Sequence, residues 1–300
     1  MMSGIAARPS EPLGGFTTVG IDLASQSDNT AVCVIIWSHE SAQVSALASG
    51  TLHGSKLDDS ALLSVMKDAD KVAIDAPFGW PQPFISAISS EPGNWPLDPD
   101  ETRAPLERRT TDFLVRDRTG KTPLSVTTDR IAYCAMRCAS ILGALNSPRD
   151  GSGQVAEAYP DAALRCWLPK LFTGSLQSYK TKNNAAARER REVILAALLG
   201  ELGNGFNITE AQRVAIAYSD DCLDAFVCAL LARATAADLT VLPSTPDHQA
   251  LARIEGWIHL PKPNSLTQLV SNLRPQATAV GDLEIHDNTK PWPPEGGHTP

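Results

Sequence analysis

The stretch Thr17-Thr18-Val19-Gly20-Ile21-Asp22 is an apolar, β-branched run that ends on a carboxylate. Its composition favours a buried β-strand, and such a strand seldom ends on an acid by accident, because an unpaired buried charge is expensive. The turn-forming residues 24–29 follow, and the β-branched run from Thr30 to Trp37 predicts a second strand. Residues Val44 to Thr51 add a third strand, so the chain begins with an antiparallel meander.

A second strand that ends on an acid follows the meander. Residues Ser60 to Asp68 have a helical pattern, and Lys71-Val72-Ala73-Ile74-Asp75 predicts a strand that Pro77 cuts off. This order differs from the regular alternation of a doubly wound nucleotide-binding fold. No glycine-rich phosphate loop follows the first strand, since Gly20-Ile21-Asp22 carries a single glycine. The chain is therefore expected to form an α/β fold outside the doubly wound class.

The remaining residues predict an insert and several further elements. Residues 82–125 are rich in Pro, Arg and Trp and form the insert, with one expected helix from Thr110 to Arg118. The other expected elements are, in chain order, a helix from Asp129 to Leu145 capped by Thr127 or Thr128, a strand from Gln154 to Tyr159, a helix from Ala185 to Leu202, a helix from Thr209 to Ala217, a helix that carries Asp221 and Asp224 and is capped by Ser219 or Asp220, and a closing strand from Ile254 to Pro261.

Composition sets the domain organisation. The chain is 43% hydrophobic and 20% charged, which is ordinary for a globular protein, and no apolar run is long enough to span a bilayer. The start of the chain lacks a signal-peptide core, so a cytoplasmic location without a membrane partner is expected. Residues 1–15 and 264–300 are expected to be disordered, which leaves residues 16–263 as one domain. The sequence does not indicate an oligomeric state.

The charge pattern bears on possible partners. A net charge of −8 argues against indiscriminate wrapping of nucleic acid. Basic residues nevertheless gather in two runs, from Arg103 to Arg137 and from Lys180 to Arg191. Each run can be a solvated helix face, which is the commoner case for a single run. Two runs that flank a cluster of acids can also form a local phosphate-binding surface, so a nucleic acid substrate stays open.

Four acids form the candidate site. Asp221 and Asp224 are three residues apart on an apolar helix and share one face. Asp221 can equally be a first-turn charge that interacts with the helix dipole, whereas Asp224 stands between two apolar residues and is expected to face inward. Asp22 and Asp75 can each be simple turn residues. Together, acids on two strands and one helix fit a two-metal site for phosphoryl transfer, in which carboxylates hold two Mg²⁺ or Mn²⁺ ions about 3.5–4 Å apart.

Seven segments resemble the signature blocks of an RNase H-like family, the one catalogued as domain of unknown function 429 and described as predicted nucleases. They are, in order, Gly20-Ile21-Asp22, Ala73-Ile74-Asp75-Ala76-Pro77-Phe78-Gly79-Trp80-Pro81, Arg109-Thr110-Thr111-Asp112, Leu124-Ser125-Val126-Thr127, Glu157-Ala158-Tyr159-Pro160, Tyr179-Lys180-Thr181-Lys182 and Asp221-Cys222-Leu223-Asp224-Ala225. The resemblance covers about Thr17 to Pro261, nearly all of the expected domain.

The resemblance implies a fold and a set of site residues. The implied fold is an RNase H-like, five-stranded mixed sheet, with three antiparallel strands and then two parallel ones, flanked by helices. It implies that the acids gather at one end of the sheet. Asp22 would come from the first strand, Asp75 from the fourth, and Asp221 and Asp224 from the last helix. The meander predicted from the residues agrees with this fold.

Other candidate residues have two interpretations each. Glu157 either ends the fifth strand near the acids, as a further metal ligand, or pairs with Arg109 or another arginine of the insert. Arg109 and Asp112 are one helical turn apart, and a structural ion pair is favoured over a substrate-phosphate contact by Arg109. Lys180 and Lys182 precede a helix N-terminus, which attracts anions, so they are the main candidates for binding a substrate phosphate.

Three functions compete. The leading hypothesis is a metal-dependent nuclease, a hydrolase of phosphodiester bonds that uses magnesium or manganese and no other cofactor. The second is a non-catalytic RNase H-like module that keeps the acids for binding or structure, which the acidic net charge favours. The third is a phosphotransferase of the sugar-kinase and actin superfamily, which normally needs a second such domain and a glycine-rich loop. The sequence does not say which nucleic acid or nucleotide would be the substrate.

Overall fold

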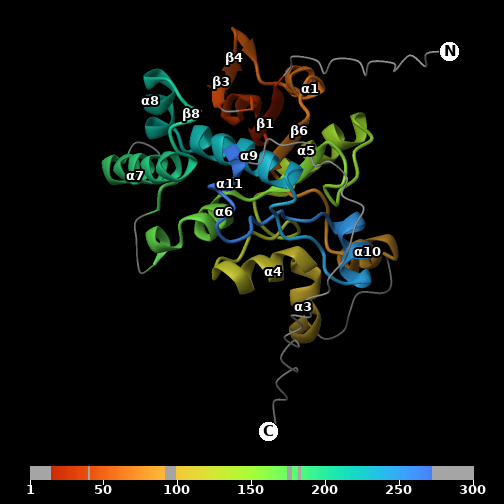
Figure 1. Cartoon of the computed structure of the whole chain (residues 1–300). Helices are drawn as coiled ribbons and strands as arrows, with labels where there is room; N and C mark the ends of the chain where they lie inside the picture. Colours follow the sequence, from red (N-terminus) through yellow and green to blue (C-terminus); the bar gives the residue numbers. More distant parts are fainter. Residues whose placement is uncertain (1–14, 40, 92–98, 174–177, 182–183, 272–300) are drawn as a thin grey trace, which may run out of the picture.

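A six-stranded mixed sheet forms the centre of the protein (Figure 1). The computed structural model describes residues 15–39, 41–91, 99–173, 178–181 and 184–271. The sheet has the order β7-β6-β1-β2-β3-β8, and its strands are β1 (Phe16–Asp22), β2 (Ala31–Trp37), β3 (Ala42–Ser49), β6 (Lys71–Asp75), β7 (Val155–Ala158) and β8 (Phe206–Asn207). β1, β2 and β3 form the expected antiparallel meander, and β6 and β7 extend it in parallel from β1.

The implied count of five strands is wrong by one. β8 pairs in parallel with the outer edge of β3, where Phe206 and Asn207 lie opposite Ala42 and Gln43. A strand of two residues is too short to show an alternating pattern, so its pairing depends on a contact that the local sequence does not encode. A separate two-stranded hairpin, β4 (Thr51–Leu52) and β5 (Ser55–Lys56), follows β3.

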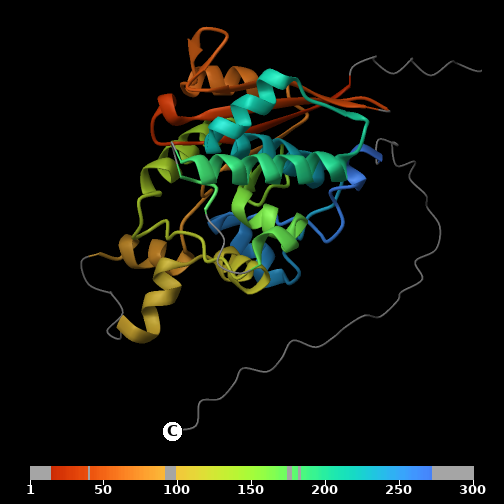
Figure 2. The same ribbon diagram turned by 90° about the vertical axis from the view of Figure 1, so that its left-hand side faces the viewer.

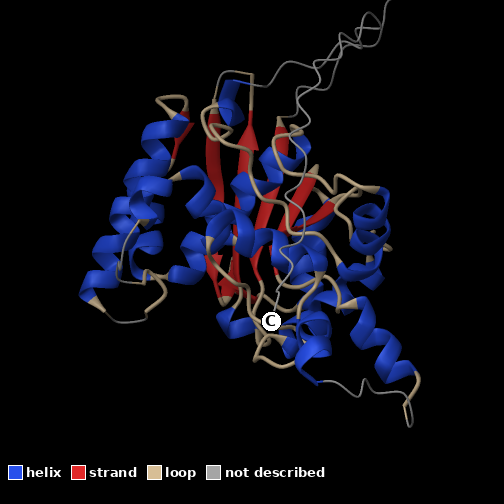
Figure 3. Ribbon diagram, turned by 90° about the horizontal axis from the view of Figure 1, so that it is seen from below, coloured by secondary structure: helices blue, strands red, loops and turns tan. Residues whose placement is uncertain are grey.

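Helices cover both faces of the sheet, as Figures 2 and 3 show. Residues Leu62 and Met66 pack with Val19 and Ile21 of β1 on one face. The helices of that face are α1 (Asp59–Lys67) and α5 (Ala132–Ala144). Those of the opposite face are α6 (Pro160–Trp167), α7 (Ala185–Leu202), α8 (Glu210–Tyr218) and α9 (Asp220–Ala236). Among the described residues, no helix is long and apolar enough to cross a membrane.

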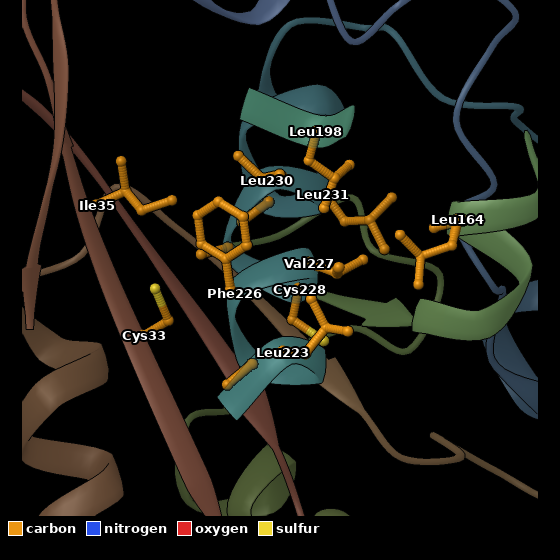
Figure 4. Packing of buried hydrophobic residues seen from close by; sticks show 14 of the residues in the cluster. Cys33, Ile35, Leu164, Leu198, Leu223, Phe226, Val227, Cys228, Leu230 and Leu231 are labelled. Atoms are coloured by element: carbon orange, nitrogen blue, oxygen red, sulfur yellow. The ribbon is translucent and has the colours of Figure 1, made fainter. Parts of the chain in front are cut away.

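Helix α9 is the centre of the larger core. Apart from the half-buried Asp221, its residues from Asp220 to Ala234 are buried, because the sheet lies on one side of it and other helices on the other. Figure 4 shows Phe226 toward Cys33 and Ile35 of β2, while Leu164 and Leu198 approach α9 from α6 and α7. An apolar helix enclosed on all sides is held rigidly, so an acid near its start is placed accurately.

The insert holds more helix than expected. It contains α2 (Gln82–Ser89), α3 (Pro99–Glu107) and the expected α4 (Thr110–Thr119). Its first helix begins with Gln82, whose backbone N–H donates to Oε1 of Glu255 at 2.9 Å, and the N–H of Thr110 donates to Oε2 of the same carboxylate at 2.7 Å. One buried acid of α10 (Pro246–Glu255) therefore accepts hydrogen bonds from free backbone N–H groups at the starts of two insert helices.

Two expected elements differ in the structure. The helix expected from Asp129 starts at Ala132, because Oδ2 of Asp129 accepts from the N–H of Ser125 at 2.7 Å and stabilises a turn instead. Neither Thr127 nor Thr128 caps it. The closing strand from Ile254 is wrong, since α10 continues to Glu255 and residue 258 makes only an isolated bridge to β7.

The folded part also extends beyond residue 263. Leu266 and Leu269 are buried in the larger core, and a short helix, α11 (Gln268–Ser271), ends the described chain. Two apolar anchors within a polar sequence are enough to hold this segment, which is why composition alone placed the boundary too early. The expected disorder of residues 1–14 and 272–300 lies outside the described residues.

Candidate functional site

Two of the four acids end neighbouring parallel strands in register. Asp22 is the last residue of β1, Asp75 is the last of β6, and the two are direct partners in the ladder. Ala158 at the end of β7 lies opposite Asp75. Because directly opposite residues in a sheet project to the same face, the two carboxylates are brought together by the backbone itself.

A glycine brings the third acid to them. A Cβ atom on Gly20 would lie 2.1 Å from the carbonyl oxygen of Ala225 and 2.1 Å from the nitrogen of Ala229, closer than real Cβ contacts come. The missing side chain therefore lets α9 lie directly against β1. In α9, Asp224 directly precedes Ala225, and in β1, Asp22 lies two positions after Gly20. The close packing of the helix on the strand therefore places Asp224 beside Asp22.

The three acids form a compact cluster. One carboxylate oxygen each from Asp22, Asp75 and Asp224 lies within 4.8 Å of the other two. Asp224 is buried, and the other two are half-buried. Asp221 is not in this group: it lies in the first turn of α9, where its charge helps to raise the pKa of Asp22. Ser219 rather than an acid caps this helix, through its Oγ and the N–H of Cys222 at 3.2 Å.

Burial opposes the charges of this cluster. Desolvation, with the neighbouring carboxylates, holds the pKa of Asp22 well above its ordinary value. Burial likewise raises the pKa of Asp75 from 3.8 to about 7, although Lys180 acts in the other direction. The pKa of Asp224 is also raised by burial, against the effect of Lys180 and two hydrogen bonds. Three crowded carboxylates therefore need positive charge to ionise together.

Two residues of one segment contact Asp224. The hydroxyl of Tyr179 donates to Oδ1 of Asp224 at 2.9 Å, and Nζ of Lys180 lies 2.9 Å from Oδ2. Burial alone would lower the pKa of Lys180, but the charge of Asp224 raises it well above its ordinary value, so Lys180 stays cationic. Lys180, a candidate for binding a substrate phosphate, is paired in the structure with a member of the cluster, and Lys182 lies outside the described residues.

Arg109 and Glu157 form a structural pair. Arg109 is 2% exposed, and its guanidinium lies 2.9 Å from Oδ1 of Asp112 and 2.8 Å from Oε1 of Glu157. The N–H of Phe78 also donates to Glu157 at 3.1 Å. The expected ion pair with Asp112 is confirmed. Because both groups are already engaged in these pairs, the structure favours the structural interpretation of each over a phosphate contact by Arg109 and metal ligation by Glu157.

Tyr179 and Asp161 are site residues that the sequence did not predict. Tyr179 stood in one of the quoted segments, but nothing local shows that its hydroxyl reaches an acid 45 positions away. Asp161 lies in the first turn of α6, contributes to the raised pKa of Asp75, and accepts from Nε of Arg165 at 2.9 Å. Its position just after the end of β7, two residues beyond Tyr159, could have indicated from the sequence that it lies near the acids at that edge of the sheet.

The cluster borders a cavity of about 470 Å³. Asp22, Asp75 and Lys180 line it, together with Tyr159 and with residues 121–124 of the insert. A cavity of this size lies in the range of sites for small molecules, about 300–1,000 Å³. Asp22 and Asp75 are therefore open to a ligand, whereas Asp224 is buried and does not line the cavity.

Titration of Asp75 gives the first prediction. In the metal-free folded state Asp75 keeps a proton up to about pH 7, whereas the unfolded chain releases it near 3.8. The folded state then binds more protons, so this residue lowers the free energy of unfolding as the pH rises from about 4 to about 7. Asp75→Asn cannot ionise and is expected to be more stable than the wild type at pH 8, by at least about 1 kcal/mol, or about 2–4 °C in Tm.

Melting curves in EDTA at pH 5, 6, 7 and 8 measure this effect. The difference in Tm between Asp75→Asn and the wild type should grow from pH 5 to about pH 7 and then level off toward pH 8. Asp28→Asn, which changes an exposed acid paired with Lys56, should show no such trend. A difference in Tm that stays constant with pH would mean that burial does not raise the pKa of Asp75.

The comparisons with known proteins give a family but no function. The family model described as "Protein of unknown function (DUF429)" matches residues 20–248. These residues include all three acids of the cluster, the insert and Lys180. No significant match to the chain was found among curated proteins, and none among solved structures.

Proposed function

The chain belongs to the DUF429 family, whose members are described as proteins of unknown function, and from its site we propose a metal-dependent hydrolase of phosphodiester bonds in a nucleic acid or nucleotide. One observation carries the proposal: carboxylate oxygens from two parallel strands and a helix lie within 4.8 Å of one another. Such a set requires three elements to converge and leaves the acids with raised pKa values. Perturbed acids beside a cavity are a common feature of functional sites.

The donor set fits a hard divalent cation. Oxygen ligands suit Mg²⁺ or Mn²⁺, and the charge of a bound cation would offset the burial and the mutual repulsion that raise the pKa values of these carboxylates. Asp22, Asp75 and Asp224 would hold the ion. When bound, it would polarise a phosphoryl oxygen and lower the pKa of a water ligand. The second ion expected from the sequence stays a prediction, and Asp221, whose charge helps to raise the pKa of Asp22, would be a further ligand for it.

The protein's own side chains position the site. The register of β1 and β6 sets the spacing of Asp22 and Asp75, and the hydrogen bond from Tyr179 orients Asp224. Lys180 balances one negative charge of the cluster, and its ammonium lines the cavity where a phosphate would enter. An orienting donor and a cation near the scissile group are typical of electrostatic stabilisation in phosphoryl transfer.

An RNase H-like fold belongs to the same proposal. The order β3-β2-β1-β6-β7, with three antiparallel strands followed by two parallel ones, is the arrangement that the sequence resemblance implies. The acids also sit at one end of this sheet, on its first and fourth implied strands. In this assignment β8 is an addition at the outer edge, and residues 121–124 of the insert line the cavity at the end that carries the acids.

One observation favours the second candidate, a non-catalytic module. The ion pair between Lys180 and Asp224 already supplies one positive charge, so the cluster has a partial internal counterion without metal. Three carboxylates against one ammonium still leave negative charge uncompensated, and this is why the hydrolase is preferred. Metal binding separates the two candidates.

The proposal is tested with a labelled single-stranded oligonucleotide and with bis(p-nitrophenyl) phosphate. We expect the wild-type protein to hydrolyse at least the oligonucleotide with Mg²⁺ or Mn²⁺, and to lose this activity in excess EDTA. Hydrolysis that is unaffected by EDTA, or no hydrolysis of either substrate with either ion, would overturn the proposal.

A further inference from the structure

The cavity beside the acids has a wall that is a fixed part of the fold. Oγ of Ser125 donates to the carbonyl oxygen of Glu107 at 2.9 Å, and Oγ1 of Thr127 donates to that of Leu106 at 3.2 Å. The guanidinium of Arg108 donates to the carbonyl oxygen of Pro123. Ser125 is fully buried. Residues 121–124 are thus tied to the end of α3, and the opening that they leave is set by the fold.

A second anchor ties the insert to the sheet. Arg109 precedes α4 and pairs with Glu157 of β7, while the carboxylate of Glu255 accepts from the N–H of Thr110. These contacts are buried or partly buried, where charge-assisted hydrogen bonds are strong. The insert therefore covers the acid end of the sheet without needing a ligand to order it.

The lining changes in character from the interior to the solvent. Asp22 and Asp75 are half-buried, whereas Leu124 is 52% exposed and Arg130 is exposed. Leu124 and Ile131 add apolar surface to the cavity. Within the described residues, Arg130 forms no ion pair or hydrogen bond, so its charge is open to a ligand. The deep end is acidic, and the outer end combines apolar surface with a cation.

We infer that this cavity binds one unpaired nucleotide unit, and this inference rests on the proposed function. The scissile phosphate lies at the acid cluster, the base lies against Leu124 and Ile131, and a neighbouring phosphate lies at Arg130. Apolar side chains that contact a base, with a cation on the backbone, are the usual means of holding an unstacked nucleotide. Tyr159, which also lines the cavity, offers an aromatic ring for the same purpose.

Duplex nucleic acid does not fit this arrangement. A cavity of about 470 Å³ has room for a single nucleotide unit but not for a base pair with both backbones. Specific duplex binding needs a large, positively charged surface, about 1,000–2,500 Å² on the protein side, whereas this chain has a net charge of −8. Enzymes whose target atom must enter a pocket act on single strands or on a base extruded from the stack.

Fluorescence anisotropy in Ca²⁺ buffer tests the inference. A labelled single-stranded octamer is compared with the same sequence in a blunt hairpin, and we expect the single strand to bind at least tenfold more tightly. Arg130→Gln should lower the slope of log K against log salt by about 0.7, the value for one phosphate contact on a single strand. The matched control is Arg116→Gln, on the exposed side of α4, which should leave the slope unchanged.

Leu124→Ser tests the base contact. We expect at least threefold weaker binding of the single strand, because apolar surface in contact with the base is lost. Leu242 is similarly exposed, at 54%, and does not line the cavity, so Leu242→Ser should bind as the wild type does. Competition by a dinucleotide, a linear strand or a circular strand then shows whether the nucleotide enters free, at a chain end or from the interior of a strand.

The outcomes separate this inference from the proposed function. Equal or tighter binding of the hairpin, or an unchanged salt slope for Arg130→Gln, overturns the nucleotide pocket. If bis(p-nitrophenyl) phosphate is hydrolysed but no oligonucleotide binds, the pocket assignment is wrong and the hydrolase stands. If the single strand binds as expected but no metal-dependent hydrolysis occurs, the hydrolase is wrong and the pocket stands.

Discussion

Asp22→Asn is expected to lower metal-dependent hydrolysis by at least about a thousandfold, or about 4 kcal/mol in the activation free energy. Asp22 neighbours both other acids of the cluster: it is the ladder partner of Asp75, and Asp224 is packed beside it by the close contact of α9 with β1. The amide keeps the shape of the side chain but removes its charge. A cation held by three carboxylates would then lose one charged ligand.

The same variant should remain folded. Burial already raises the pKa of Asp22, so replacing the carboxylate by an amide removes a destabilising charge, and its Tm in EDTA should equal or exceed that of the wild type. Asp28→Asn serves as the matched control, because it changes an exposed acid outside the cluster, and this variant should keep full activity. Wild-type rates in Asp22→Asn would show that the cluster is not catalytic.

Arg109→Met is expected to have the largest effect on stability. Its guanidinium is buried between Asp112 and Glu157, and without it two carboxylates are left buried and unpaired. Breaking a buried ion pair in this way costs about 3–5 kcal/mol. For a chain of this size, that corresponds to a fall in Tm of about 6–20 °C.

A control on the same helix makes this result specific. Arg116→Met removes an exposed guanidinium that pairs with Asp117, a type of pair worth about 0–1 kcal/mol, and should change Tm little. Adding Glu157→Gln to Arg109→Met should recover part of the loss, because one uncompensated charge disappears. If Arg109→Met melted like the wild type but failed to bind oligonucleotide, the phosphate contact considered from the sequence would be right and the structural pair wrong.

Local patterns were enough to predict the strand ends. Asp22 and Asp75 each end a short apolar run, and runs of this kind indicate buried strands. The register that makes Asp22 and Asp75 partners is a tertiary property. Once two neighbouring parallel strands both end on an acid, however, their carboxylates must lie at the same edge of the sheet. Asp224 could be predicted from helical spacing, since an acid between apolar neighbours in a fully apolar helix faces the interior.

Contacts between distant segments could not be predicted. The choice between two roles for Glu157 depended on Arg109, 48 positions away, and the role of Lys180 depended on Asp224. In both cases the sequence named the right residues, but charge pairing in three dimensions decided what they do. β8 and the burial of Leu266 escaped prediction for a related reason, because each is stabilised by its partner and not by its own pattern.

Isothermal titration of Mn²⁺ into the metal-free protein tests directly whether these acids form a metal site. We expect binding at pH 8, and binding with release of protons at pH 6, where the raised pKa values keep part of the cluster protonated. Asp75→Asn should bind at least tenfold more weakly, and Asp28→Asn should bind as the wild type does. No heat of binding at millimolar Mn²⁺ in the wild type, or equal binding by Asp75→Asn, would contradict the claim that these acids form a metal site.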